Sequence, residues 1–231
     1  LVDVEVMLGS SIMSYTDEGG QMKVFYEDNM FVTDSTFFDV FAFQLTAGNP
    51  ATALSDPSNV VITERVARKY FGEEDPMGKT LSLQGNFKVK VTGVMKDIPE
   101  NSHLKISALF SMSVFQGNVD NTWIWPEFHT YLKLVPNTNV ENLEPQFKEF
   151  VHKYLGEVME EFGIEENMHL QQITDIHLGG SLAREAKENG DQQIVTFLTI
   201  IAIIILIIAW INYVNLSTAR SLERASEVGI R

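Results

Sequence analysis

The residue types that most often carry chemistry are scattered along this sequence. Its five histidines are His103, His129, His152, His169 and His177. No two of them stand four residues apart on a predicted helix, and no H-E-x-x-H motif occurs, so the sequence predicts no zinc site. The chain has no cysteine, which excludes disulfides, thiolate metal ligands and a cysteine nucleophile.

One triplet, Gly78-Lys79-Thr80, has the form of the end of a phosphate-binding loop. The complete motif needs a glycine five residues earlier, where this chain has Glu73, whose charge would repel phosphate. We therefore interpret the triplet as a turn that leads into a strand. No serine lies in a G-x-S-x-G frame either. The sequence predicts no ATP site, no cofactor and no catalytic residue.

A run of glutamates near the middle of the C-terminal half could indicate calcium, and its members are Glu157, Glu160, Glu161, Glu165 and Glu166. Calcium loops of the EF-hand type have a fixed ligand spacing that is missing here. Carboxylates three and four residues apart on a helix more often form its solvated face. We interpret the run as such a face.

Two pairs of side chains leave two interpretations open. Trp123 and Trp125 could mark an interaction loop or could anchor a loop in the core. Asn212 and Asn215 follow a long apolar run. They could contact a neighbouring membrane helix, because amides in hydrocarbon seek hydrogen-bond partners, or they could lie at the membrane surface.

The composition excludes two further classes of protein. The 231 residues contain 17 Lys+Arg against 31 Asp+Glu, a formal net charge of −14, and 45% of them are hydrophobic. Binding to nucleic acid needs clustered basic residues, so no nucleic-acid partner is expected. The apolar content is too high for a wholly disordered chain.

The apolar residues are concentrated near the C-terminus. No charged residue occurs between Ile194 and Ala219, and Ile194–Ile211 reads IVTFLTIIAIIILIIAWI. A bilayer core about 30 Å thick needs about 20 apolar helical residues. The run therefore predicts a transmembrane helix; a buried core helix is the alternative.

The charges that flank this run predict its orientation. Residues 194–231 contain three arginines and two glutamates, a net of +1, which leaves −15 on residues 1–193. Arginines close to a membrane span favour the cytoplasmic side. We expect a cytoplasmic C-terminus and an extracytoplasmic acidic domain. The chain also has the character of a piece of a longer protein, with a first membrane anchor expected before Leu1 and a cytoplasmic continuation after Arg231.

Strands and helices are expected to alternate irregularly, which favours an α+β fold. Helices are predicted at Thr36–Phe41, at Glu64–Phe71 between a Thr63 cap and Gly72, and at 140–161. Strands are predicted at Met22–Thr33, Val60–Ile62, Leu81–Leu83, Phe87–Val91, Thr130–Val135 and Leu170–Leu178.

Several segments in order resemble the extracytoplasmic core domain of MacB/FtsX-like ABC transporter permeases. They are Asp34–Phe41 (DSTFFDVF), Gly48-Asn49, Val60–Gly78 (VVITERVARKYFGEEDPMG), Val91–His103 (VTGVMKDIPENSH), Thr130–Leu134 (TYLKL), Asp175–Leu178 (DIHL) and Ile211–Arg231 (INYVNLSTARSLERASEVGIR). The resemblance runs from about residue 22 to the C-terminus, and residues 1–21 carry little pattern.

The resemblance implies a two-part outer domain followed by one transmembrane helix. A porter-like α+β subdomain would comprise residues 1–57 and 127–190. A strand-rich, sabre-like insert would comprise 58–126. The membrane helix would occupy 191–219, and a cytoplasmic segment would begin at 220.

The function that the resemblance implies is mechanical and not enzymatic. A separate ATPase subunit or domain would hydrolyse ATP in the cytoplasm. The permease, as a dimer of copies or halves in the bacterial inner (cytoplasmic) membrane, would relay the conformational change to residues 1–190 outside. A periplasmic partner or substrate would receive it, for efflux, lipoprotein movement or control of the cell envelope.

The last helical residues are the candidate coupling segment of such a relay, namely Arg220, Glu223, Arg224, Glu227 and Arg231. Their alternating charges would form one charged face of a continuing helix. Simple anchoring of arginines at the membrane edge is the other interpretation.

Two other classes of function were weighed against the permease. A membrane-bound sensor should continue into a heptad-patterned signalling helix, whereas this tail reads R-A-S-E-V-G-I-R. An anchored ectoenzyme would need converging acid, base or nucleophile residues. The sequence shows no such set.

Overall fold

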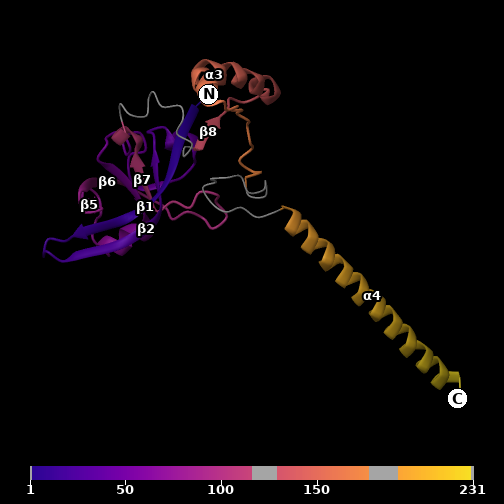
Figure 1. The fold of residues 1–231 in the computed structure, drawn as a ribbon. Coiled ribbons are helices and arrows are strands. Elements are labelled where there is room, and N and C mark those ends of the chain that lie inside the picture. Colours follow the sequence, from indigo (N-terminus) through magenta and orange to yellow (C-terminus); the bar gives the residue numbers. More distant parts are fainter. Residues whose placement is uncertain (1, 116–128, 177–191, 230–231) are drawn as a thin grey trace. The chain divides into compact units, whose positions relative to one another are not determined.

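The computed structural model describes residues 2–115, 129–176 and 192–229 of the chain. Contacts divide the chain into two compact units, Leu1–Leu170 and Gln171–Arg231. The first unit holds all the strands described, and the second holds one long helix (Figure 1).

The elements of the first unit are short except for one hairpin and one helix. In chain order they are β1 (Val2–Thr16), β2 (Met22–Thr33), α1 (Phe37–Val40), β3 (Leu45–Gly48), β4 (Asn59–Thr63), α2 (Glu64–Phe71), β5 (Thr80–Leu83), β6 (Phe87–Met95), β7 (Ala108–Ser111), the 3-10 turn η1 (Met112–Phe115), β8 (His129–Lys133) and α3 (Val140–Phe162).

One mixed sheet contains every described strand. Six of these strands pair in a closed ring. The circuit runs β1, β2, β7, β4, β6, β5 and back to β1, while β3 pairs with β6 and β8 with β1. The β1–β2 hairpin is the longest antiparallel pair (Figure 1, indigo). A shift of register between Gly9 and Ser11 interrupts β1. Such an irregularity bends a strand and increases its twist, which allows β1 to pair with β2, β5 and β8.

Helix α2 covers the core side of this sheet. Thr63 begins it, with the side-chain oxygen accepting a hydrogen bond from the Val66 amide, and Gly72 ends it at a φ of 65°. Its apolar face buries Tyr70 and Phe71 against Met13 and other strand residues. The fully buried strand β4 contributes Val60 and Ile62 to the same core, and it pairs with β6 and β7 on its two sides.

A buried polar cluster fixes α2 on the hairpin. The Tyr70 hydroxyl lies 3.0 Å from Glu27 Oε1 and 3.1 Å from the carbonyl oxygen of Met13. Lys69 Nζ lies 2.5 Å from the same carboxylate and 4.4 Å from the ring centre of Phe25. Burial, and then the charge of Glu27, raise the pKa of Tyr70, so the phenol stays protonated and donates.

Gly48 shows why a glycine ends β3. Its φ is +97°, and a Cβ there would lie 2.8 Å from the Cα of Gly93 and closer still to the carbonyl oxygen of Thr92. No side chain fits between β3 and β6 at this point. This glycine is one of the residues on which the family resemblance rests.

The predicted α+β class is confirmed, and so are most of the predicted elements. Helix α2 and strand β2 have the predicted bounds, and α3 differs by one residue at its end. The turn at Gln84–Asn86 is a hairpin turn with positive φ at Gln84 (48°) and Gly85 (77°). Lys79 lies in a turn that leads into β5, as expected.

The predicted strand at Leu170–Leu178 is wrong over the residues described. Residues 173–176 form a turn, with Asp175 N–H donating to the Gln172 carbonyl, and 170–172 are irregular. The apolar residues Leu170, Ile173 and Ile176 recur every three positions, which is not the period of a strand. Residues 177 and 178 lie outside the described part, as do Trp123 and Trp125.

The expected porter-like and sabre-like parts share this one sheet. Strands β4 to β7, from the expected insert, pair with β1, β2 and β3 from the other part. The boundary at 126/127 lies outside the described residues. The division at 57/58 and 126/127 stays a prediction.

The second unit contains α4 (Gln192–Gly229). Residues Gln193–Ser221 form the candidate membrane span, and every one of their side chains is exposed. None of these side chains is buried among the described residues. At 1.5 Å per residue, a span of this length is roughly 44 Å, long enough for a ~30 Å bilayer core.

Candidate functional site

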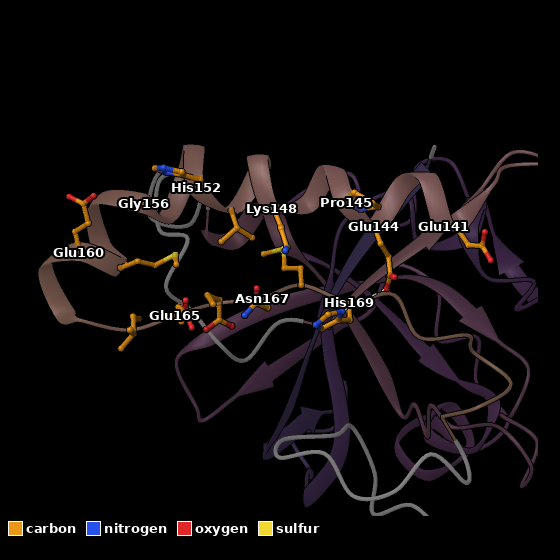
Figure 2. A pocket seen from close by; sticks show the side chains of 15 residues that line it. Glu141, Glu144, Pro145, Lys148, His152, Gly156, Glu160, Glu165, Asn167 and His169 are labelled. Carbon is orange, nitrogen blue, oxygen red and sulfur yellow. Dashed lines mark ion pairs between the residues drawn. The ribbon is translucent and has the colours of Figure 1, made fainter.

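A groove runs along α3 in the first unit. Its second wall is the segment after the helix, residues 163–169, which returns along the helix (Figure 2). The groove has a volume of about 720 Å³, within the usual range of small-molecule sites. Its lining residues are Glu141, Glu144, Pro145, Lys148, Val151, His152, Gly156, Met159, Glu160, Ile164, Glu165, Glu166, Asn167, Met168 and His169.

Local sequence signals begin the helix and reverse the chain after it. The Asn139 side chain accepts a hydrogen bond from the Asn142 amide. Pro145 lies inside the helix, in its second turn, where it has no amide hydrogen to donate to the Glu141 carbonyl. Gly163 has a left-handed conformation, with a φ of 62°, and the Ile164 amide donates to the Met159 carbonyl at 3.1 Å. This type of helix end turns the chain back along the helix.

One carboxylate holds the far end of the returning segment. Glu144 Oε1 accepts a hydrogen bond from the Leu170 amide at 3.0 Å. The same oxygen lies 3.9 Å from His169 Nδ1, and Figure 2 shows the two side chains facing each other. The returning segment is therefore joined to α3 at both ends, by the turn at Gly163 and by this contact.

The lining contains an apolar set of side chains, here called the floor, and a set of five glutamates, here called the rim. Val151 is 4% exposed, and Met159, Ile164 and Met168 add further apolar surface. The fifteen lining residues include five glutamates and one lysine, which gives the groove a formal charge of −4 when the histidines are neutral. In Figure 2, Lys148 points from α3 toward the returning segment.

Gly156 makes room on the helix for a histidine ring. A Cβ at Gly156 would lie 2.7 Å from Nδ1 of His152, one turn earlier. A glycine inside a helix costs about 1 kcal/mol relative to alanine. Here its missing side chain allows His152 to lie flat against the helix beside the groove.

The arrangement is suited to binding. Within 2–115, 129–176 and 192–229, no three potential ligands converge on a metal position. No serine or threonine lines the groove as a nucleophile. A shaped apolar floor with a charged rim can bind and orient a molecule.

Only some glutamates of the acidic run, which we interpreted as a solvated face, line the groove. Glu160, Glu165 and Glu166 line the groove, whereas Glu157 and Glu161 do not. The groove itself was missed, because it depends on the reversal at Gly163 and on the Glu144–Leu170 contact. The one sequence signal was a glycine directly after the helix, followed by Ile164 and Met168.

The predicted membrane-contact residues lie on α4. Asn212 and Asn215 are both exposed and, being three residues apart, share one side of the helix. Trp210 and Tyr213 are exposed beside them, at the end of the apolar run. Aromatic residues of this kind are typical of the membrane–water interface. The role of the asparagines is not tested and stays a prediction.

The candidate coupling residues lie on the same unbroken helix. Positions 220, 223, 224 and 227 follow an i, i+3, i+4, i+7 pattern, which places their backbone positions on one face. Arg220 is exposed. Arg231 lies outside the described residues. Helix α4 and the groove belong to different units.

The segments that carried the family resemblance have structural roles. Asp97 Oδ1 accepts a hydrogen bond from the Arg65 amide in the first turn of α2, and its Oδ2 lies 2.9 Å from Arg68 Nη2. Together with Thr63, Gly48 and Gly72, this residue fixes the turns of the fold. The resemblance therefore rests in part on residues that determine the architecture.

The comparisons with known proteins agree with this interpretation. Residues 2–150 match the family model described as the MacB-like periplasmic core domain. A permease-protein domain from Porphyromonas gingivalis is similar in structure, with a TM-score of 0.57 and 24% identity over 67% of this chain and 70% of that one.

A second structural neighbour is the periplasmic region of MacB from Actinobacillus actinomycetemcomitans. Its TM-score is 0.50 at 19% identity, over 68% of each chain. Both likenesses are in fold. Among curated protein sequences, none matches this chain.

Proposed function

This chain belongs to the family of MacB-like periplasmic core domains of ABC transporter permease-type proteins, and we propose on that premise that it relays ATP-driven conformational change across a membrane. Domains of this family belong to transporter permeases, which are generally non-catalytic and work with an ABC ATPase. The family and the apolar helix together indicate a membrane-anchored protein with an extracytoplasmic segment.

The continuity of α4 is the observation that carries the proposal. One helix, Gln192–Gly229, contains the whole candidate span and continues into the charged stripe that starts at Arg220. An unbroken helix is a stiff element, so a displacement of its charged end would move its apolar part as well. We propose that the stripe transmits motion between the ATPase side and the span.

The orientation and the partners belong to the same proposal. Residues 1–190 would lie outside the bacterial inner membrane, and the C-terminus would lie in the cytoplasm, because the arginines follow the span. The permease would act as a dimer on a periplasmic partner or substrate. Asn212 and Asn215 support the dimer, because amides on one side of an apolar helix are stabilised by a partner helix.

The test is a charge exchange in the coupling segment of the permease, reconstituted with its ATPase in nanodiscs. The chain has no cysteine, so a dye on Ser55→Cys, in the exposed turn before β4, reports ATP-dependent change in the outer domain. The double variant E227R/R231E keeps the net charge and should reduce the ATP-induced dye signal at least fivefold.

A matched exchange on α3 provides the control. K153E/E157K reverses two charges at the same four-residue spacing, on exposed side chains outside the coupling segment. It should leave the ATP-induced signal within twofold. If E227R/R231E also keeps the full signal and normal ATPase activity, the stripe does not couple the two sides.

A further inference from the structure

The groove along α3 has the chemistry of a ligand site that its family membership does not assign. It differs from a charged surface patch in two respects. It has a buried apolar residue, Val151, in its lining, and its second wall is tied to α3 at two points, the Gly163 turn and the Glu144–Leu170 contact. The volume of about 720 Å³ admits an organic molecule rather than a single ion.

The charges of the lining select the sign of the ligand. Five carboxylates against the ammonium of Lys148 leave the groove at −4, so an anion would be repelled. Among the described residues no three carboxylates or histidines meet at one point that could hold a metal. A diffuse acidic rim favours a bulky, weakly hydrated cation over a compact metal ion.

The apolar floor favours a ligand that has an apolar part besides its cationic head. Met159, Ile164 and Met168 come from both walls, and methionine side chains adapt to irregular apolar shapes. Ile164 and Met168 are 48% and 40% exposed, so the floor is open to a molecule from solvent. An apolar chain along these residues would place its cationic head at the rim.

We propose that this groove binds a small amphiphilic cation, an apolar chain with an organic ammonium head. The site lies wholly within the first unit, on α3 and the returning segment. It does not depend on the coupling role of α4, so the proposed relay can fail while this site stands, and the reverse is also true.

The direct experiment is a calorimetric titration of the full chain in nanodiscs, with empty nanodiscs as the blank. The probe is octyltrimethylammonium, whose charge does not change with pH, and octyl sulfate is the probe of opposite charge. The cation should bind above the blank, with at least tenfold higher affinity than octyl sulfate. Equal affinities, or binding no greater than to empty nanodiscs, would overturn the proposal.

Matched variants separate the rim from the overall acidity of the chain. E160Q/E165Q/E166Q removes three rim carboxylates and should weaken the cation at least tenfold. E149Q/E157Q/E161Q removes the same number of charges from exposed residues of α3 outside the lining and should change the affinity less than twofold. An equal loss in both triple variants would show attraction to general acidity and would overturn the site. Glu144 is left intact because it holds the returning segment.

Two further variants change the affinity in opposite directions. K148Q removes the cation that competes with the ligand and should strengthen binding severalfold, which a merely damaged fold would not do. M159S/M168S makes the floor polar and should weaken the probe at least fivefold. If a short lysine peptide bound and octyltrimethylammonium did not, the groove would be a peptide site and the proposal would be wrong.

Discussion

The sheet unit and helix α4 use apolar residues in opposite ways. In Leu1–Leu170 many of them are buried in one core, and every residue of β4 is buried. In α4 they are exposed along the whole span, where only lipid or another helix can cover them. The two units also differ in where their polar side chains form hydrogen bonds. Tyr70 and Glu27 bond across elements, whereas the hydroxyls of Thr199 and Thr218 bond back to carbonyls of their own helix. One unit is stabilised by itself and the other by its surroundings.

The largest expected difference between the two units is in the cost of removing an apolar side chain. Ile62→Ala, in the fully buried β4, should lower the free energy of unfolding of the sheet unit by about 2–5 kcal/mol. Ile204→Ala, on α4, should leave that free energy within about 0.5 kcal/mol, because the side chain is half exposed and belongs to the other unit. Denaturant unfolding of the chain in nanodiscs, followed by circular dichroism, measures both. Equal losses would mean that α4 packs on the sheet unit.

Removing a buried hydroxyl should lower the free energy of unfolding less than truncating a buried isoleucine does. It should lower it more than removing an exposed hydroxyl does. Tyr70→Phe leaves the Met13 carbonyl without this donor and Glu27 with one fewer, so the sheet unit should lose about 1–2 kcal/mol. Tyr26→Phe removes a surface contact with Ser10 Oγ at 2.9 Å and should cost under about 0.5 kcal/mol. The same unfolding curves give both values. If Tyr70→Phe left the free energy of unfolding unchanged, the polar cluster would not fix α2 on the hairpin.

The smallest expected effect is a pH dependence confined to the sheet unit. Burial, and then the charge of His129, lower the pKa of His103 from its ordinary value of 6.5. The unfolded chain then binds the proton more readily than the folded chain, so stability is complete above about pH 6.5 and falls as the pH drops below it. The hydroxyl of Tyr131 lies 3.2 Å from Nε2 of His103. Burial raises the pKa of Tyr131 to about 12, so this hydroxyl stays protonated over the whole range.

The variant His103→Gln tests this dependence. Its unfolding free energy should change less between pH 7 and pH 5 than that of the parent chain. The apolar span of α4 has no Asp, Glu, His, Lys or Arg between Ile194 and Ala219, so its helical signal should not change over this range. If the parent and the variant lost stability equally below pH 6.5, His103 would not be the group responsible.

The sequence predicted local structure well where short-range signals determine it. Helix α2 has a threonine cap, an apolar face and a closing glycine within ten residues, and its bounds agree with the prediction. The apolar run at Ile194–Ile211 needs no distant contact to be recognised. The candidate coupling stripe could likewise be placed on one helix face from its spacing alone.

Features that depend on distant contacts could not be predicted. Strand β1 was missed because Gly9, Ser10 and Ser11 interrupt its alternation, and its pairing with three other strands holds it extended. The closed circuit of strands requires both parallel and antiparallel pairs, which alternation in a single strand does not encode. The groove depends on a contact between Glu144 and Leu170, 26 residues apart.

The most direct test of the whole account is the accessibility of single cysteines from each side of the membrane, since the chain has none of its own. Ser55→Cys reports the outer domain and Ser226→Cys reports α4 beyond the span. With a membrane-impermeant maleimide on intact cells whose outer membrane has been opened, the account predicts labelling at 55 and none at 226 until the inner membrane is broken. Labelling of both positions from the same side would contradict a helix that crosses the membrane.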